Sequence, residues 1–144
     1  MKPLKEIEIA IAICERAGKI LLIQRRDNNP MWDKQWEFPG GKLEAGETPE
    51  AAMHREVTEE TGLPILESSF FHLHHHDWDL PEKVLRVHVH CFYCVVGEGD
   101  VRLEDEKAYQ HAWPTPAEAL DYDSLSANND ILHIFLHART PNMG

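Results

Sequence analysis

The sequence predicts a compact α/β layered domain, and two observations support this fold class. Short apolar, β-branched runs alternate with segments of helical pattern, so strands and helices are mixed along the chain rather than segregated. The 144 residues contain no internal repeat, linker or low-complexity segment, and this length is typical of one domain with a sizeable core. We therefore expect residues 1–144 to form a single domain.

Strands are expected in the N-terminal third of the chain. Two apolar, β-branched runs, Glu6–Cys14 and Lys19–Gln24, flank a turn at residues 15–18 and predict a hairpin. The polar residues 25–31 contain an Asn-Asn-Pro sequence and predict a loop. A short strand is expected at Trp36–Phe38, where a proline and two glycines stop it.

A helix is expected after a loop that runs up to Glu47. Thr48 is a suitable N-cap residue, and Pro49 suits the first helical position. Glu50 then lies near the positive end of the helix dipole. Gly62 is a suitable residue for the left-handed conformation that ends many helices. These signals predict a helix that begins at Pro49 and ends just before Gly62.

The C-terminal half predicts three more strands and two helices. In chain order these are Phe70–His76, Val84–Val96, Tyr109–Trp113, Pro116–Leu120 and Ser126–Ala138. Residues 77–81 are expected to form the turn between the first two strands. Odd-numbered residues of the second strand, from Leu85 to Val95, share one apolar face. The last helix carries an apolar stripe that includes Ile131 and Phe135.

The charge of the chain limits the classes of partner. Its 25 acidic and 14 basic residues leave a formal net charge of −11, which argues against a broad phosphate-binding surface and stable binding of DNA or RNA. No apolar run approaches the roughly 20 residues of a membrane span. The first residues lack the apolar region of a signal peptide. We therefore expect a cytoplasmic protein without a membrane partner, either a monomer or a homodimer.

The three cysteines are expected to be buried structural thiols. Cys14, Cys91 and Cys94 provide no even disulfide framework, which favours a reducing compartment. Cys91 and Cys94 form a C-x-x-C sequence within a predicted strand. Residues three apart in a strand point to opposite faces, so this pair is not arranged as a zinc knuckle.

Three glutamates in the predicted helix point to a cation site. Glu56, Glu59 and Glu60 follow the spacing i, i+3 and i+4, which puts their carboxylates on one helical face. Like charges placed so cost about 0.2–0.5 kcal/mol per pair. Mg²⁺ and Mn²⁺ prefer carboxylate oxygen, so this face predicts a site for a hard divalent cation.

The segment Gly41–Leu63 resembles the Nudix box, G-x5-E-x7-R-E-U-x-E-E-x-G-U, in which U is a bulky aliphatic residue. Every specified position agrees: Gly41, Glu47, Arg55, Glu56, Val57, Glu59, Glu60, Gly62 and Leu63. The preceding strand is similar to the MutT branch, and the order of elements agrees over nearly the whole chain. The resemblance implies the Nudix α/β/α sandwich with a mixed β-sheet.

The resemblance also implies an activity and a cofactor. Nudix hydrolases cleave a nucleoside diphosphate linked to another group, by metal-assisted attack of water on the pyrophosphate. MutT-like members remove nucleotides such as 8-oxo-dGTP from the pool, releasing the monophosphate and pyrophosphate. The implied metal ligands for Mg²⁺ or Mn²⁺ are Glu56, Glu59, Glu60 and the carbonyl of Gly40. A glycine there lets the backbone approach the ion without a Cβ in the way.

Further catalytic roles follow from the same resemblance. Arg55 is expected to brace the box by pairing with a loop carboxylate, for which we choose Glu47. The general base stays open among three groups: Glu56, Glu59 and a glutamate of a distant loop. In the acidic loop at residues 103–107, Glu106 aligns best with that glutamate and Glu104 is the alternative. The competing interpretation of this loop is a solvated acidic turn.

Four positions outside the box are implied to bind the nucleotide. Arg26 and Phe38 correspond to residues beside the nucleotide and its base, and Asn128 to an asparagine that recognises a purine edge. Asn128 is alternatively a helix N-cap. Met31 stands where the MutT enzyme has a histidine, and Trp36 replaces a smaller aliphatic residue. These departures leave the base preference open.

Two alternatives to triphosphate hydrolysis remain. One is a Nudix hydrolase of another nucleotide, such as a nucleotide sugar, ADP-ribose or a 5′-triphosphate RNA end. The other is a non-catalytic Nudix domain that senses a ligand. The complete set of carboxylates favours the enzyme over the sensor.

A row of histidines has no role in the resemblance. His72, His74 and His76 alternate along one face of a predicted strand, which we interpret as a half-exposed strand face. The alternative is a transition-metal site, for which imidazoles are suitable ligands. His88 and His90 share the polar face of the neighbouring strand, and the two rows are expected to pair across the strands.

Overall fold

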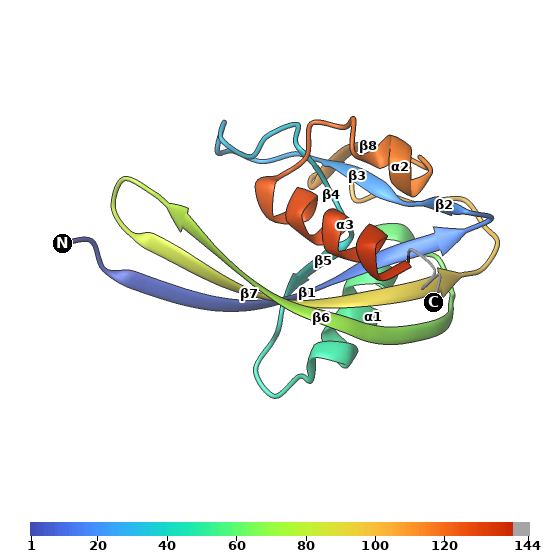
Figure 1. The fold of residues 1–144 in the computed structure, drawn as a ribbon, viewed down its shortest axis with the longest axis horizontal. Helices are drawn as coiled ribbons and strands as arrows, with labels where there is room; N and C mark the ends of the chain where they lie inside the picture. Colours follow the sequence, from blue (N-terminus) through green and yellow to red (C-terminus); the bar gives the residue numbers. More distant parts are fainter. Residues whose placement is uncertain (140–144) are drawn as a thin grey trace.

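The structure is a computed structural model that describes residues 1–139. Its elements are, in chain order, β1 (Leu4–Arg16), β2 (Lys19–Ile20), β3 (Leu22–Arg25), β4 (Trp36–Glu37), β5 (Gly40–Lys42), α1 (Pro49–Thr61), β6 (Ile65–Asp79), β7 (Val84–Val96), β8 (Ala108–Ala112), α2 (Pro116–Ala119) and α3 (Ser126–Arg139). Figure 1 shows the three long strands β1, β7 and β6 side by side, with the helices gathered around one part of them.

A mixed sheet of five strands forms the centre of the molecule. Its order is β2-β1-β7-β6, and β5 pairs with β1 beside this path. β1 and β7 are parallel, whereas β6 pairs with β7 in the antiparallel direction. The mixed sheet implied by the family resemblance is therefore confirmed.

A second, smaller sheet has the order β4-β3-β8. It corrects the expected hairpin, because only Glu15 and Arg16 of β1 pair with β2. The chain turns at Ala17 and Gly18, both of which have positive φ. It then leaves the central sheet, and β3 pairs with β4 and β8 instead. The predicted Lys19–Gln24 strand is thus divided between two sheets.

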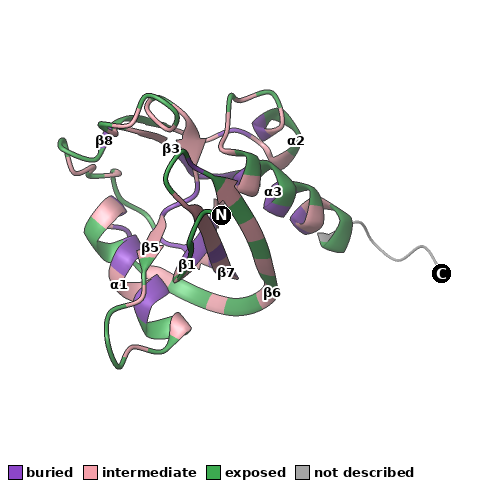
Figure 2. Cartoon of the chain, turned by 90° about the vertical axis from the view of Figure 1, so that its left-hand side faces the viewer, coloured by how far each residue is buried: buried purple, intermediate pink, exposed green. Residues whose placement is uncertain are grey.

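The helices cover both faces of the central sheet, and each face has its own apolar core. α1 packs Ala52, Met53 and Val57 on one face. α3 packs Ile131 and Phe135 against the other, together with buried side chains of β1 and β7. Figure 2 shows α1 and α3 on opposite sides of the strands. This arrangement is the α/β/α sandwich that we expected.

The helix α1 has the bounds and caps that its sequence predicts. The hydroxyl of Thr48 accepts a hydrogen bond from the backbone N–H of Ala51, at 3.1 Å. Pro49 is its first residue, and Gly62 ends it in the left-handed region with φ 71°. Since both ends are determined locally, the orientation of the α1 side chains follows directly from the sequence.

The strand expected at Phe70–His76 is longer at both ends. β6 continues to Asp79, because residues 77–79 pair with the start of β7 rather than turning. The turn is confined to residues 80–83, where the N–H of Leu80 donates to the carbonyl of Lys83. Among the described helices, none is long and apolar enough to cross a membrane.

The register of β6 on β7 also corrects the expected pairing of the two histidine rows. His74 lies opposite Val89, whereas His75 lies opposite His88. Directly opposed residues in a sheet point to the same side, so the row with His74 faces α3 and His88 lies on the other face. His75 contacts His88 instead, with 2.7 Å between their Nδ1 atoms.

The cysteine prediction is confirmed. All three cysteines are buried as free thiols. Cys91 belongs to the core under α3, and Cys94 to the core under α1.

Candidate active site

Strand β5 brings two glycines against the carboxylates of α1, in a segment where we had expected a loop. Gly40 and Gly41 pair with Ile11 and Ala10 of β1. The N–H of Gly40 donates to Oε2 of Glu60, at 3.0 Å. This edge of the sheet therefore lies directly beside the C-terminal half of α1.

Each glycine is required because a different group lies where its Cβ would be. A Cβ at Gly41 would lie 2.5 Å from the carboxylate carbon of Glu56. A Cβ at Gly40 would meet the carbonyl oxygen of Ala10 and the backbone of Ile11. We had explained the glycine at position 40 by the approach of the backbone to an ion. This reason is incomplete, because packing on β1 already excludes a side chain there.

Arg55 connects the segment before α1 to the carboxylates of the helix. Its Nε and Nη2 contact the two oxygens of Glu47, at 2.7 and 2.9 Å. Its Nη1 donates to Glu56 at 2.8 Å and to Glu59 at 3.3 Å, and Nη2 also donates to the carbonyl of Lys42. Hydrogen bonds from Arg55 lower the pKa of Glu47 to about 2. The expected pairing of Arg55 with Glu47 is confirmed.

Glu56, Glu59 and Glu60, hereafter the acidic cluster, all line one cavity of about 1080 Å³. Glu56 is 8% exposed, whereas Glu59 reaches further into solvent. Burial raises the pKa of Glu60 well above its usual range, and the carboxylates of Glu37 and Glu56 raise it further. Crowded, partly buried carboxylates with oxygen as their donor atom fit a hard divalent cation, whose charge would offset their repulsion.

Glu37 is a cavity residue that the sequence analysis missed. It lines the same cavity, and its carboxylate lies 3.1 Å from Nη1 of Arg25. Arg25 also pairs with Asp27, at 2.7 Å. Burial raises the pKa of Glu37 even though Arg25 opposes this shift. The sequence carried no clear signal, because a glutamate between two aromatic residues of a short strand is also the pattern of a side chain that faces solvent.

Three of the four expected nucleotide-binding residues line the cavity: Arg26, Phe38 and Asn128. The Arg26 guanidinium lies 4.4 Å from the ring centre of Tyr109. Asn128 is 7% exposed, and its Nδ2 donates to the carbonyl of Trp36 at 3.4 Å. Because α3 begins at Ser126, Asn128 lies inside the helix, and its alternative as an N-cap is wrong.

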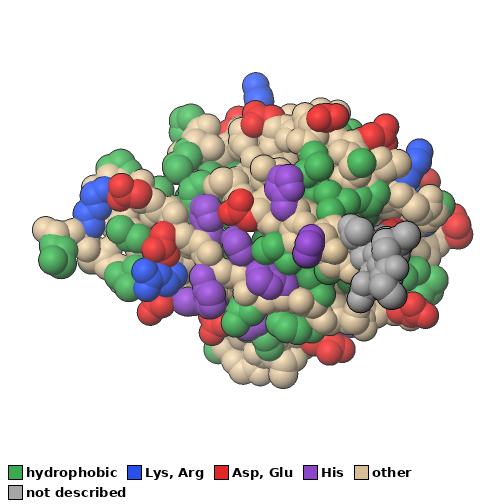
Figure 3. Space-filling view, in the orientation of Figure 1, with side chains coloured by type: hydrophobic (Ala, Val, Ile, Leu, Met, Phe, Trp, Pro, Cys, Tyr) green, Lys and Arg blue, Asp and Glu red, His purple; other side chains and the backbone are tan. Residues whose placement is uncertain are grey.

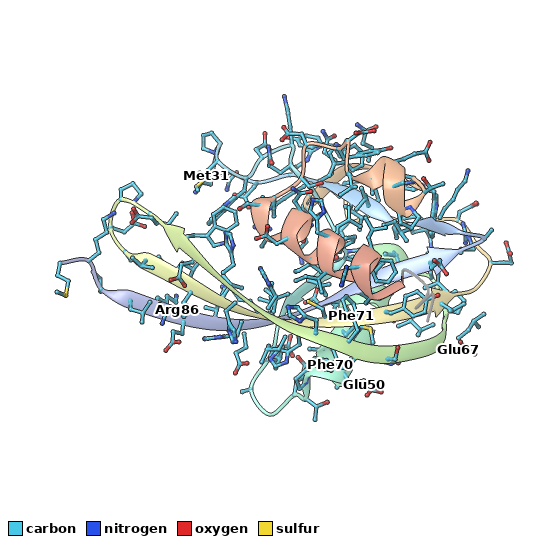
Figure 4. The ribbon with its side chains drawn as sticks, in the orientation of Figure 1. Met31, Glu50, Glu67, Phe70, Phe71 and Arg86 are labelled. Carbon is cyan, nitrogen blue, oxygen red and sulfur yellow. The ribbon has the colours of Figure 1, made fainter. Side chains whose placement is uncertain are left out.

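The structure does not bring Met31 to the cavity. Met31 is 47% exposed, and Figure 4 places it on the outer edge of the loop between β3 and β4. A turn in which Oδ1 of Asn29 accepts the N–H of Met31 directs the next residue inward. Trp32 therefore lines the cavity in its place.

The acidic loop before β8 presents Glu104, rather than Glu106, to the cavity. Glu106 is exposed and does not line the cavity. Glu104 lines the cavity. Its Oε1 is buried and has no hydrogen-bond partner among the described residues. The same oxygen lies 3.7 Å from Nζ of Lys107. The N–H groups of Lys107 and Ala108 both donate to the Glu104 carbonyl, and this turn carries Glu106 outward. Our choice of Glu106 over Glu104 is not supported by this geometry.

Comparison with known proteins identifies the family. The model of the NUDIX domain family matches residues 5–135, which is nearly the whole chain. The protein belongs to the NUDIX domain family. It is thus a Nudix hydrolase, an enzyme that cleaves a phosphoric anhydride bond of a nucleotide, and enzymes of this family generally use a divalent metal ion.

Similar proteins cover nearly the whole length of this Nudix hydrolase. A CTP pyrophosphohydrolase of Escherichia coli strain K12 is 32% identical over 139 residues, which cover 94% of this chain and 96% of the relative. An 8-oxo-dGTP diphosphatase of Haemophilus influenzae is 34% identical over 135 residues, covering 92% and 93%. The solution structure of the E. coli ORF135 protein has a TM-score of 0.70 at 30% identity, covering 98% and 96%.

Proposed function

We propose that this Nudix hydrolase is a Mg²⁺-dependent pyrophosphohydrolase that cleaves a nucleoside triphosphate to the monophosphate and pyrophosphate. The observation that carries the proposal is a cavity of about 1080 Å³, which joins the acidic cluster to the aromatic rings of Trp32 and Phe38, on either side of β4, and to the amide of Asn128 in α3. Its volume is slightly above the range of about 300–1,000 Å³ that is typical of ligand pockets, so it has room for a nucleotide.

The acidic cluster and the Gly40 carbonyl would hold Mg²⁺. A bound Mg²⁺ would offset the charge of the phosphates and make a water molecule a stronger acid. Arg55 holds Glu56 and Glu59 in place through its hydrogen bonds to both. The N–H of Gly40 orients Glu60. These contacts support a prearranged set of oxygen donors.

Two cationic side chains support an extended phosphate chain as the substrate. The backbone N–H of Arg26 donates to the carbonyl of Lys107, at 2.9 Å, so both residues lie at the same junction between β3 and β8. Both line the cavity. Their positive charges favour an anionic group that extends from the acidic cluster toward β3.

The base would lie between aromatic residues and Asn128. Phe38 and Trp32 line this part of the cavity, and their rings are suitable for stacking on a base. The amide of Asn128 can both donate and accept, as the edges of cytosine and 8-oxoguanine require. We therefore propose cytidine triphosphates and 8-oxo-dGTP as the first candidates, in agreement with the names of the two relatives that match most of the chain.

A pyrophosphate-release assay tests the proposal. The panel contains CTP, dCTP, dGTP, 8-oxo-dGTP, ADP-ribose and a triphosphorylated RNA, each with saturating Mg²⁺. We expect pyrophosphate and the monophosphate from at least one free triphosphate. Preferred cleavage of ADP-ribose or RNA would overturn the substrate class, and binding without turnover across the panel would overturn the catalytic role.

Matched variants test the metal site in the same assay. Glu59→Gln and Glu60→Gln are expected to lose most turnover while keeping the fold. Glu50→Gln is the control, because Glu50 lies on the same helix but outside the cavity (Figure 4). Mg²⁺ should raise the melting temperature of the wild type and of Glu50→Gln, since it binds the folded state. A full shift in Glu60→Gln would contradict the assignment.

A further inference from the structure

Two histidines of β6 and an aspartate of α3 converge outside the cavity described above. His74 and His76 lie on the face of β6 that is turned toward α3, and Asp130 lies on that helix. One ligand atom of each residue lies within 4.8 Å of the others. Figure 3 shows several histidine side chains gathered around an acidic side chain on this face. We call these three residues the His–Asp cluster.

The spacing of the ligand atoms is close to that of a metal site. Nε2 of His74 and Nδ1 of His76 lie 3.6 and 3.9 Å from Oδ2 of Asp130. Two ligands bound at about 2.1 Å to a tetrahedral ion are about 3.4 Å apart. Small side-chain rotations would therefore bring the three atoms to coordination distance.

His74 has a nitrogen available for a cation. Its Nε2 is buried and has no hydrogen-bond partner among the described residues. Buried polar atoms nearly always have a hydrogen-bond partner. It is therefore unusual that Nε2 of His74 lies 3.6 Å from Oδ2 of Asp130 without forming a hydrogen bond. Burial, together with the neighbouring histidines, lowers the pKa of His74 despite the opposing effect of Asp130. A lowered pKa favours the neutral ring, which is the form that binds metals.

The second nitrogen of His76 is already held in place. Nε2 of His76 lies 3.1 Å from the hydroxyl of Ser126, at the start of α3. The Trp78 ring packs edge-on against His76, with 4.7 Å between ring centres. Metal-binding histidines are oriented in this way, by a hydrogen bond from the nitrogen that does not bind the ion.

We propose that His74, His76 and Asp130 bind a transition-metal ion of the Zn²⁺ class, at a site separate from the acidic cluster. Two imidazole nitrogens and one carboxylate oxygen suit Zn²⁺ or Co²⁺, whereas Mg²⁺ prefers oxygen alone. Asp130 is 53% exposed, which leaves a side of the site open to water. The ion would tie α3 to β6 close to Asn128, which lines the substrate cavity.

Metal titration of tag-free protein tests this site. The protein is stripped of metal, and Mg²⁺ is kept in excess so that the acidic cluster is saturated. We expect one equivalent of Zn²⁺ to bind in calorimetry and to raise the melting temperature. Co²⁺ should give the visible absorption of a tetrahedral site. Absence of Zn²⁺ binding, or an octahedral Co²⁺ spectrum, would overturn the proposal.

Variants assign the ion to these residues. His74→Ala and Asp130→Asn should each weaken Zn²⁺ binding by about tenfold or more, and Ser126→Ala by about tenfold through His76. Asp130→Asn removes an exposed charge, so its fold is expected to persist even if His74→Ala is unstable. His88→Ala, on the opposite face of the sheet, is the matched control and should bind as the wild type does. Unchanged binding in Asp130→Asn, or loss of binding in Glu59→Gln, would contradict the assignment.

Discussion

The carboxylate of Glu56 occupies the space in which a side chain at Gly41 would begin. The carboxylate carbon lies 2.5 Å from the position of a Cβ at residue 41. Because Glu56 is also held by Arg55, it has little room to move aside. The glycine and the glutamate of the Nudix box therefore depend on each other, although one belongs to β5 and the other to α1.

Replacing Gly41 should impair catalysis more than stability. Gly41→Ala would displace the Glu56 carboxylate, and a shift of about 1 Å in a catalytic group is enough to lower kcat by about 100-fold. Steady-state kinetics with saturating Mg²⁺ measures the effect. Gly97→Ala is the control, because its Cβ would crowd the ring of Pro64, away from the cavity. Equal losses in both variants would contradict the role of the Gly41–Glu56 contact.

The pair formed by Arg55 and Glu47 should matter through the metal site. Glu47→Gln would weaken the two-point contact and leave Arg55 free to reorient, so the Mg²⁺ concentration that gives half-maximal activity should rise several-fold. Glu44→Gln is a close control, since Glu44 is more exposed and lies 3.7 Å from Nη1 of Arg55. A Mg²⁺ titration of activity distinguishes the two variants. The explanation fails if Glu44→Gln shifts the titration as much as Glu47→Gln does.

Two neighbouring glutamates before β8 should differ in their effect on turnover. Glu104→Gln is expected to lower kcat by about tenfold or more, because Glu104 lines the same cavity as the acidic cluster and its Oε1 is buried without a partner among the described residues. Glu106→Gln should leave kcat close to the wild-type value, since Glu106 is exposed. Measuring both variants with one triphosphate decides between them. A loss of turnover in Glu106→Gln alone would restore the choice made from the sequence.

Asn128 should contribute to recognition of the base. Asn128→Ala removes a buried amide at the cavity and should raise KM by about tenfold for the preferred triphosphate, as loss of about one hydrogen bond predicts. Asn129→Ala changes the adjacent exposed residue and should leave KM unchanged. A comparison of KM for CTP and 8-oxo-dGTP in both variants measures the effect. A loss confined to kcat would point to a structural role of Asn128 instead.

Arg25 should stabilise the protein by partnering Glu37. Arg25→Met would leave the half-buried carboxylate of Glu37 without its cation, at a cost of about 1–3 kcal/mol in the free energy of unfolding. The folded pKa of Glu37 is already raised by burial, and it would rise further without Arg25. A raised folded pKa means that stability falls as the pH increases from the unfolded pKa to the folded one. The loss should therefore be greater at pH 8 than at pH 5.

Urea unfolding at the two pH values tests this prediction, with chelator present. Arg86→Met is the matched control, because Arg86 pairs with Asp77 and both side chains are exposed. Such surface pairs contribute about 0–1 kcal/mol. Asp27 and Glu60 also act on the Arg25–Glu37 pair, and neither charge is changed in the variants. A pH-independent loss in Arg25→Met would rule out the titration of Glu37 as its cause.

The helical part of the segment Gly41–Leu63 was predictable from the sequence because its structure is local. Thr48 and Gly62 cap α1 through contacts within a few residues, and the helical period alone puts Glu56 and Glu60 on one side. The pairing of Arg55 with Glu47 was also expected, from the resemblance to the Nudix box, and the structure contains it. The strand Gly40–Lys42 was missed because its pairing partner, β1, lies far away in the chain.

The loops were less predictable. Glu104 and Glu106 have the same chemistry, and the turn before β8 decides which of them reaches the cavity. Met31 and Trp32 are adjacent, and the turn at Asn29 determines which of them points inward. Local sequence patterns carry little information about such directions, because a loop takes its orientation from the elements on which it packs.

The sequence by itself determined the family of the protein, the order of most of its strands and helices and the carboxylate face of α1. Only the tertiary structure decided that β3 leaves the central sheet, that Glu37 and Glu104 line the cavity and that His74 and His76 meet Asp130. The physical reason is the range of the interactions involved. Caps and helical periodicity depend on neighbours in the chain, whereas these contacts depend on how distant elements pack and on which face of each strand the sheet register exposes.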